Sequence, residues 1–219
     1  MENKQQSANE QENVGFLHDL DDYFSKKYAD FDLISSVPSY QSVTVSMILK
    51  NKNRIEEGEY AANEMRKIAY QPDPAAVLAE VKQKYVDNTF TFNFRPAPFG
   101  TRLKALFGSK NTAGGYIKKL VSNYGDRAEG LYERLGMAEK DWNAVLRGFY
   151  IPEKVLVYKL TLLLGLSQTD NLELMKACGC FYDFADARDV VVRYLVDYRV
   201  YNRDMINKAF DEYNIRRIL

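Results

Sequence analysis

The sequence predicts an all-α fold made of an N-terminal helical segment, a short extended Phe-rich link and a C-terminal helical bundle. Apolar residues recur at helical spacing along most of the 219 residues. The segments with this spacing end near Gly, Asn or Pro and have the length of ordinary globular helices. One stretch, TFTFNFRPAP at 89–98, alternates instead with the period of a strand.

The N-terminal part is predicted to begin with a disordered tail at 1–13, followed by a helical region of unknown role at 14–88. The tail, MENKQQSANEQEN, is polar and poor in apolar residues, which is typical of disorder. From Phe16 onward, FLHDLDDYFSKKY places its apolar residues on one face of a helix. We therefore expect the first amphipathic helix to begin near Phe16.

The rest of this region contains a loop and further helices. The segment SSVPSYQS at 35–42 is typical of a loop, because it contains a proline and four serines. VTVSMILKNKNRIEE fits a strand or a helix at its start, and its apolar spacing favours a helix, as does that of EYAANEMRKIAY. In QPDPAAVLAEVKQKY at 71–85, Asp73 and Pro74 are a strong helix start.

Residues 89–98 mark the predicted boundary between the two parts of the chain. Phe90, Phe92 and Phe94 alternate with small or polar residues, and two prolines end the run. A lone strand is not stable by itself, so we expect this segment to add to another strand edge or to lie as an extended linker. Residues 99–219 then form the bundle, beginning with a short helix that has a basic face.

Within the bundle, YERLGMAEKDWNAVLRG at 132–148 has the spacing of a helix-turn-helix, in which one helical pattern closes on a glycine and a second follows at once. On the second helix, Lys140, Asn143 and Arg147 fall on the face opposite the apolar residues. These residue types bond phosphates or base edges. Glu139 precedes them at the helix start, where an acid suits the helix dipole but repels phosphate.

The same landmarks resemble the lambda-repressor-like (Xre-type) helix-turn-helix family over residues 113–166, about a quarter of the chain. The resemblance implies a DNA reader that uses residues 138–148. The chain departs from the family at two positions, because Ala128 and Glu139 stand where the family has glutamines. The C-terminal helices are similar to those of bacterial proteins that carry this unit as an accessory module. The resemblance rests on the closing glycines, on Pro152, and on apolar residues at family positions: Leu131, Tyr132, Leu135, Trp142, Val145, Leu156, Leu160 and Leu164.

A rim of basic residues is expected around this unit. Lys118 and Lys119 on its first helix, and Lys154 after the reading helix, are the candidates for positioning a phosphate backbone. Residues 101–166 hold eleven Lys and Arg against six Asp and Glu, whereas residues 1–36 hold three lysines against eight acids. The whole chain is balanced at 30 each, so a solvated, charge-balanced surface stays an equally open interpretation.

Other classes of function leave less trace in the sequence. The chain has no phosphate-binding loop, dinucleotide fingerprint, nucleophile elbow or zinc-protease motif, so we expect no enzyme and no cofactor. His18 is the only histidine, and Cys178 and Cys180 alone cannot complete a zinc site; we expect them to be small, partly buried residues at a helix end. The longest apolar run is too short to cross a bilayer, and no signal peptide is visible, which predicts a cytoplasmic protein.

Two functions therefore remain in competition. The first is a non-enzymatic regulator that binds double-stranded DNA through the helix-turn-helix. The second is a protein-interaction or adaptor module that keeps this scaffold without reading DNA. In the second, Tyr198 and Tyr201 among the C-terminal arginines would contact a protein partner or a second copy. Tyrosines in such helices are also often half-buried core residues.

Overall fold

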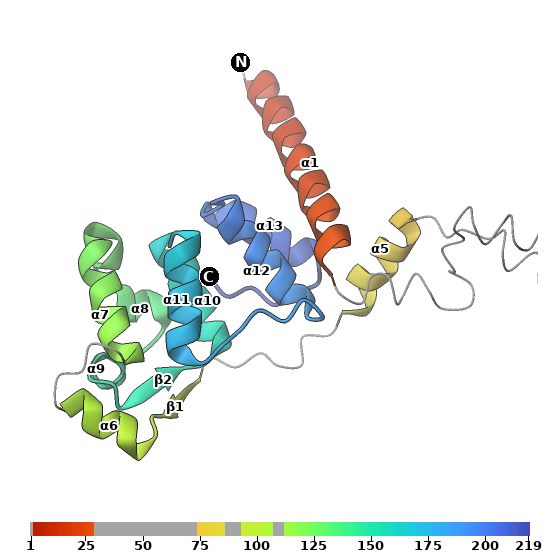
Figure 1. Ribbon diagram of the computed structural model, residues 1–219. Coiled ribbons are helices and arrows are strands. Elements are labelled where there is room, and N and C mark those ends of the chain that lie inside the picture. The colour runs from red at the N-terminus through yellow and green to blue at the C-terminus, as the bar shows by residue number, and fades with distance from the viewer. Residues whose placement is uncertain (1, 29–73, 86–92, 107–111) are drawn as a thin grey trace, which may run out of the picture.

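The computed structural model describes residues 2–28, 74–85, 93–106 and 112–219 (Figure 1). This part of the chain contains ten α-helices, a short 3-10 helix and a two-stranded sheet, which confirms the all-α fold class. The predicted loop at 35–42 and the helices predicted between 43 and 70 lie outside it. The elements are α1 (Glu2–Lys27), α5 (Pro74–Lys84), β1 (Phe94–Pro96), α6 (Phe99–Leu106), α7 (Ala113–Asn123), η1 (Gly125–Ala128), α8 (Leu131–Leu135), α9 (Glu139–Leu146), β2 (Tyr150–Pro152), α10 (Lys154–Leu164), α11 (Gln168–Cys178), α12 (Ala187–Asp197) and α13 (Arg203–Glu212).

The first helix begins earlier than the sequence predicts. α1 starts at Glu2, so residues 2–13, for which the composition predicts a disordered tail, continue the helix outward. Glu, Gln, Lys and Ala are good helix formers, and they extend a helix that packing already fixes further along the chain. The N-terminal half of α1 reaches beyond the other helices in Figure 1.

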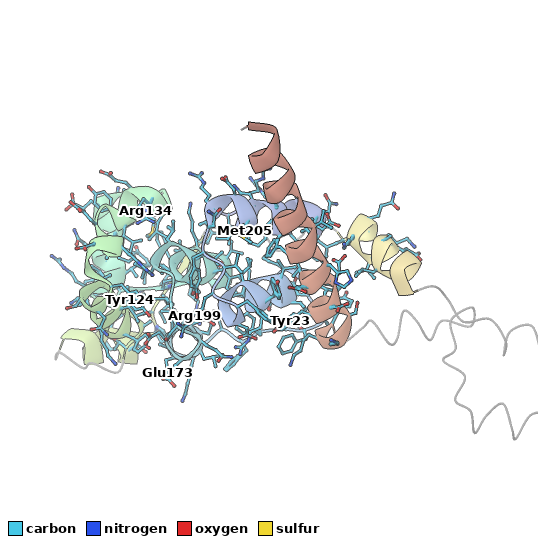
Figure 2. All side chains as sticks on the ribbon, turned by 90° about the horizontal axis from the view of Figure 1, so that it is seen from above. Tyr23, Tyr124, Arg134, Glu173, Arg199 and Met205 are labelled. Atoms are coloured by element: carbon cyan, nitrogen blue, oxygen red, sulfur yellow. The ribbon has the colours of Figure 1, made fainter. Side chains whose placement is uncertain are left out.

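The second half of α1 packs on α12 and α13, as Figure 2 shows near Tyr23. Phe16, Leu20 and Phe24 repeat every fourth residue and are buried in the same core as the C-terminal helices. Lys82 of α5 links α1 to α13 through two ion pairs. Its ammonium lies 2.7 Å from a carboxylate oxygen of Asp21 on α1 and 2.6 Å from one of Glu212 on α13. The described parts of the predicted N-terminal region therefore share one core with the bundle.

The strand-like segment finds its partner in the bundle. β1 pairs antiparallel with β2, with Arg95 opposite Ile151 and Phe94 opposite Pro152. Residues 93–98 thus belong to a sheet edge and do not form a free linker, while 89–92 lie outside the described residues. The sequence does not reveal β2, because three residues between a glycine and a helix carry no alternation that could be recognised.

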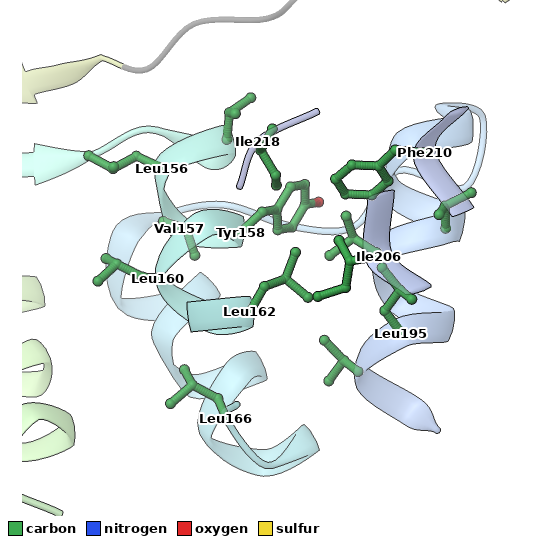
Figure 3. Close-up of a cluster of buried hydrophobic side chains, with 14 of the residues drawn as sticks. Leu156, Val157, Tyr158, Leu160, Leu162, Leu166, Leu195, Ile206, Phe210 and Ile218 are labelled. Carbon is green, nitrogen blue, oxygen red and sulfur yellow. The ribbon is translucent and has the colours of Figure 1, made fainter. Parts of the chain in front are cut away.

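The centre of the bundle is α10, which is buried on most sides. Figure 3 shows Tyr158 and Leu162 of α10 pointing toward Ile206 and Phe210 of α13, whereas Leu160 points the other way. α10 also packs against α8, α11 and α12. The cluster that contains α10 also includes buried residues from α8, α9 and α12: Leu131, Trp142, Val145 and Val191.

Candidate nucleic-acid interface

The first helix of the predicted unit, α7, is fixed against α9 by a close backbone approach. A Cβ atom placed on Gly114 of α7 would lie 2.4 Å from the carbonyl oxygen of Val145 and 2.8 Å from the amide nitrogen of Gly148. Real Cβ atoms do not come so close to backbone, so only glycine allows this packing. Thr112 caps α7 by accepting a hydrogen bond from the Gly115 amide.

The helix before the turn is shorter than the sequence predicts. The pattern RAEGLYERLG predicts one helix, but the structure divides it into η1 and the five-residue α8. The break lies at Glu129, which is extended, and at Gly130, whose φ of 58° is left-handed and unfavourable for residues with a side chain. Ala128, which the apolar spacing assigns to this helix, therefore belongs to η1. Leu131 and Leu135 keep their predicted core positions.

The three candidate contacts on α9 lie together on its outer face. Trp142 and Val145 are buried, whereas Lys140, Asn143 and Arg147 are exposed. Because these three are three and four positions apart, they project from one side of the helix. The contact with Gly114 holds this side in a fixed orientation relative to α7.

The charge on this face is uneven. The first turn of α9 carries Glu139 and Asp141. Glu133 of α8 accepts a hydrogen bond from the Tyr132 hydroxyl at 3.1 Å, and the charge of Glu139 on α9 acts on the same hydroxyl. This bond, followed by the charges of Glu133 and Glu139, raises the pKa of Tyr132. The N-terminal end of α9 is thus acidic, while residues 143–148 add Arg147 and no acid.

The two lysines of α7 face different neighbours. Both Lys118 and Lys119 are exposed. Lys118 follows Gly114 by one helical turn and therefore lies on the side of α7 that approaches α9. Lys119 lies on the α11 side. Its ammonium is 5.5 Å from the ring centre of Tyr116, whose hydroxyl donates to Asp170 of α11.

Lys154 is placed away from the α9 face. It begins α10, and its ammonium forms an ion pair with the buried carboxylate of Asp189 on α12. Burial raises the pKa of Asp189, and the bond and charge of Lys154 oppose that rise. Removing Lys154 would therefore leave a buried carboxylate without its cation. The structure gives this residue a bridging position between α10 and α12.

The two tyrosines expected to contact a partner have different surroundings. Tyr198 is 61% exposed, and its ring centre is 4.7 Å from that of Tyr194 and 6.0 Å from that of Tyr23. Tyr201 is half-buried, and its hydroxyl donates to the carbonyl oxygen of Leu166. Figure 2 separates Tyr23, the neighbour of Tyr198, from Tyr124 at the end of α7. Tyr198 caps the C-terminal end of α12, which lies apart from α9 in Figure 1.

Asp170 joins the unit to the helix that follows it. Its carboxylate accepts hydrogen bonds from Tyr124 at 2.8 Å, Ser167 at 2.9 Å and Tyr116 at 3.2 Å. Partial burial disfavours the charge of Asp170, but these bonds hold its pKa below the usual value. The bonds fix α7 to the N-terminus of α11 and stabilise the orientation of the whole unit.

One group of basic residues could not be found from the sequence. Arg95, Lys154 and Arg188 come from three distant parts of the chain and line one cavity beside Cys180. Both cysteines are free thiols near the end of α11, with Cys178 buried and Cys180 half-buried, as predicted. No group of three or more His, Cys, Asp or Glu residues suited to a metal ion occurs within the described ranges.

No helix in the described part of the chain combines the length and the apolar character needed to span a membrane. We also compared the chain with models of protein families, with curated proteins and with solved structures, and none of these searches found a match.

Proposed function

We propose that this protein binds the backbone of nucleic acid through the outer face of α9. The observation that carries the proposal is the exposed row of Lys140, Asn143 and Arg147 on a helix fixed by the close approach at Gly114. Lys118 lies on the side of α7 that approaches α9, and it adds a fourth polar group to this row. The resemblance to Xre-type helix-turn-helix proteins supports the same face.

The acids at the start of α9 determine how the contact is made. In helix-turn-helix proteins the N-terminal residues of the reading helix reach the base edges. Here Glu139 and Asp141 occupy that end and repel phosphate. We therefore propose that the C-terminal half of α9, with Asn143 and Arg147, lies against the phosphates. Such a contact gives binding with little preference for sequence.

The experiment is gel retardation of a short DNA duplex at low salt. The wild-type protein is expected to retard the duplex, and Arg147→Ala is expected to weaken the complex roughly tenfold through loss of one charged contact. Lys176→Ala, on the exposed side of α11, removes the same charge elsewhere and serves as the matched control. If the wild-type protein leaves the duplex unretarded, the proposal is wrong.

A second candidate function is contact with a protein through Tyr198. An aromatic side chain 61% exposed, with Tyr194 and Tyr23 as rigid neighbours, is a typical anchor of a protein interface. Self-association is the simplest version, and sedimentation over a range of concentrations measures it. This candidate predicts association that Tyr198→Ser weakens. A protein that stays monomeric at every concentration argues against self-association.

A further inference from the structure

We propose that the cavity between α8, the C-terminal end of α10 and the start of α13 binds a small anion with an apolar body. Its volume is about 270 Å³. Arg134 of α8 and Arg203 of α13 line it, and none of the described residues in its wall is acidic. Two guanidinium groups beside an apolar wall suit a ligand that joins an oxyanion to an apolar group. The remaining wall is apolar or aromatic: Leu162, Leu163, Tyr201 and Leu219.

The charges of these two arginines are not neutralised by a carboxylate. Arg134 donates to the carbonyl oxygens of Arg127 at 2.8 Å and Leu163 at 3.3 Å, which are neutral acceptors. Arg203 is exposed at the start of α13. Of the ion pairs among the described residues, none involves either arginine or the terminal carboxylate of Leu219. A guanidinium has five N–H donors, so Arg134 as well as Arg203 keeps donors and charge for a ligand.

Two further cations lie close to the two arginines. Arg127 of η1 donates to the carbonyl oxygen of Leu164 at 3.2 Å. Lys159 of α10 donates to the carbonyl oxygen of Leu135 at 3.4 Å. Burial, and then the charge of Arg203, lowers the pKa of Lys159, so these two cations are close enough to repel each other. The carbonyl end of α10 offsets only about half a charge. The excess of positive charge attracts anions to this part of the surface.

The acids nearest in sequence do not pair with the two arginines. Glu133, next to Arg134, accepts the Tyr132 hydroxyl at 3.1 Å. Asp204, next to Arg203, is exposed in the first turn of α13, where an acid suits the helix dipole. Consecutive residues of a helix project about 100° apart, and neither acid takes part in an ion pair of the described residues. A ligand would therefore not have to displace a carboxylate from either guanidinium.

The apolar wall is held in place by packing around the end of α10. Leu162 is buried and points from α10 toward α13, as Figure 3 shows. Tyr201 is half-buried, and its hydroxyl donates to the carbonyl oxygen of Leu166. Its ring lies so close to Gly165 that a Cβ atom there would stand 3.2 Å from the Cδ2 atom of the ring. A ligand would thus meet a wall that has already lost its freedom to move, which lowers the entropic cost of binding.

The size and the chemistry of the cavity define the ligand class. Pockets for drug-sized molecules have volumes of roughly 300 to 1,000 Å³, and this one, at about 270 Å³, is at the lower limit. The planar guanidinium groups of Arg134 and Arg203 match the oxygens of a carboxylate or a phosphate. The ring of Tyr201 offers a surface on which a flat apolar group can pack. We therefore assign the site to small aromatic acids that carry a carboxylate or a phosphate.

The experiment measures the binding of small probes to the full chain by saturation-transfer NMR at constant ionic strength. Phenyl phosphate and benzoate carry the two possible acid groups, whereas benzyl alcohol has the same ring without a charge. We expect the better of the two anions to bind about tenfold more tightly than benzyl alcohol, and its identity assigns the acid group. Equal dissociation constants for all three probes would overturn the site. Inorganic phosphate that competes as well as the probe itself would overturn the role of the apolar wall.

Variants separate this site from the α9 face. Arg203→Gln is expected to weaken binding of the anionic probe about tenfold, because one charge-assisted contact is lost. Lys208→Gln, an equal charge change at an exposed position of α13, is the matched control, and far-UV circular dichroism checks that both variants fold. Arg147→Ala is expected to keep the wild-type affinity, so failure of nucleic-acid binding leaves this test intact. Unchanged affinity in Arg203→Gln, or an equal loss in Lys208→Gln, would contradict the proposal.

Discussion

Gly114 of α7 lies against the carbonyl oxygen of Val145 in α9 so closely that a Cβ atom would stand only 2.4 Å from it. Because the neighbouring atoms belong to the backbone, the clash could be relieved only by moving one helix. This contact sets the angle between the two helices, and it therefore orients the exposed row of Lys140, Asn143 and Arg147 on α9.

The first prediction tests this contact. Gly114→Ala should lower the free energy of unfolding by about 1–3 kcal/mol, because overpacking forces backbone shifts. Urea denaturation followed by circular dichroism measures it. Gly100→Ala on α6 is the matched control, since a Cβ there meets nothing within 4 Å. Equal stability of the two variants would show that the two helices do not approach as closely as described.

The second prediction is that the hydrogen bonds of Asp170 make the stability of the fold depend on pH. The pKa of Asp170 is lower in the folded protein than in the unfolded chain, where a carboxyl titrates near about 3.9. As the pH falls, the unfolded state therefore takes up a proton at Asp170 before the folded state does. The stabilisation from the charged carboxylate is present above the unfolded pKa and is lost as the pH falls toward the folded pKa. Urea denaturation should show that the wild type loses more stability than Asp170→Asn between about pH 5 and pH 3. Parallel pH profiles would contradict this role.

The third prediction concerns the core. Leu160 of α10 is 1% exposed and belongs to the central cluster. Leu160→Ala should cost about 2–5 kcal/mol in the free energy of unfolding, through lost apolar burial and the cavity left behind. Leu172→Ala on α11 removes the same atoms where the side chain is 43% exposed, and thermal or urea denaturation should show a much smaller loss. A similar loss in both would mean that α10 is not the centre of the bundle.

The fourth prediction concerns the buried thiol. Burial raises the pKa of Cys178 to about 12, so this thiol stays protonated in the folded protein at mildly alkaline pH. The thiolate is the reactive form, and alkylation of Cys178 should therefore be far slower than that of Cys180 until denaturant is added. Mass spectrometry of the two modified positions measures the ratio. Comparable rates in native buffer would show that the end of α11 opens readily.

Much of the helical architecture was predictable, because local signals determine it. The apolar stripe of Phe16, Leu20 and Phe24 and the start signal at Pro74 each lie within a single segment. The division between η1 and α8 was missed, since a glycine within a helical pattern does not by itself specify a left-handed φ. The strand β2 was missed because only its pairing with β1, more than fifty residues earlier, makes it a strand.

The candidate site was predictable only in part. The outward direction of Lys140, Asn143 and Arg147 follows from helical spacing and holds in the structure. The partners of Lys119 and Lys154 depend on how α11 and α12 pack, which no local pattern specifies. The same is true of the cavity beside Cys180, since its cations come from β1, α10 and α12 and carry no shared motif.

If the exposed face of α9 binds the phosphate backbone, DNA binding must weaken as salt is added, because counterions compete with the basic side chains. Fluorescence anisotropy gives the association constant of a short duplex over a series of salt concentrations. If Lys118, Lys140 and Arg147 each neutralise one phosphate, a plot of the logarithm of this constant against the logarithm of the salt concentration should have a slope of about −3. Arg147→Ala should reduce the slope by about one. An absence of binding, or a slope that Arg147→Ala leaves unchanged, would show that the α9 face does not bind the phosphate backbone.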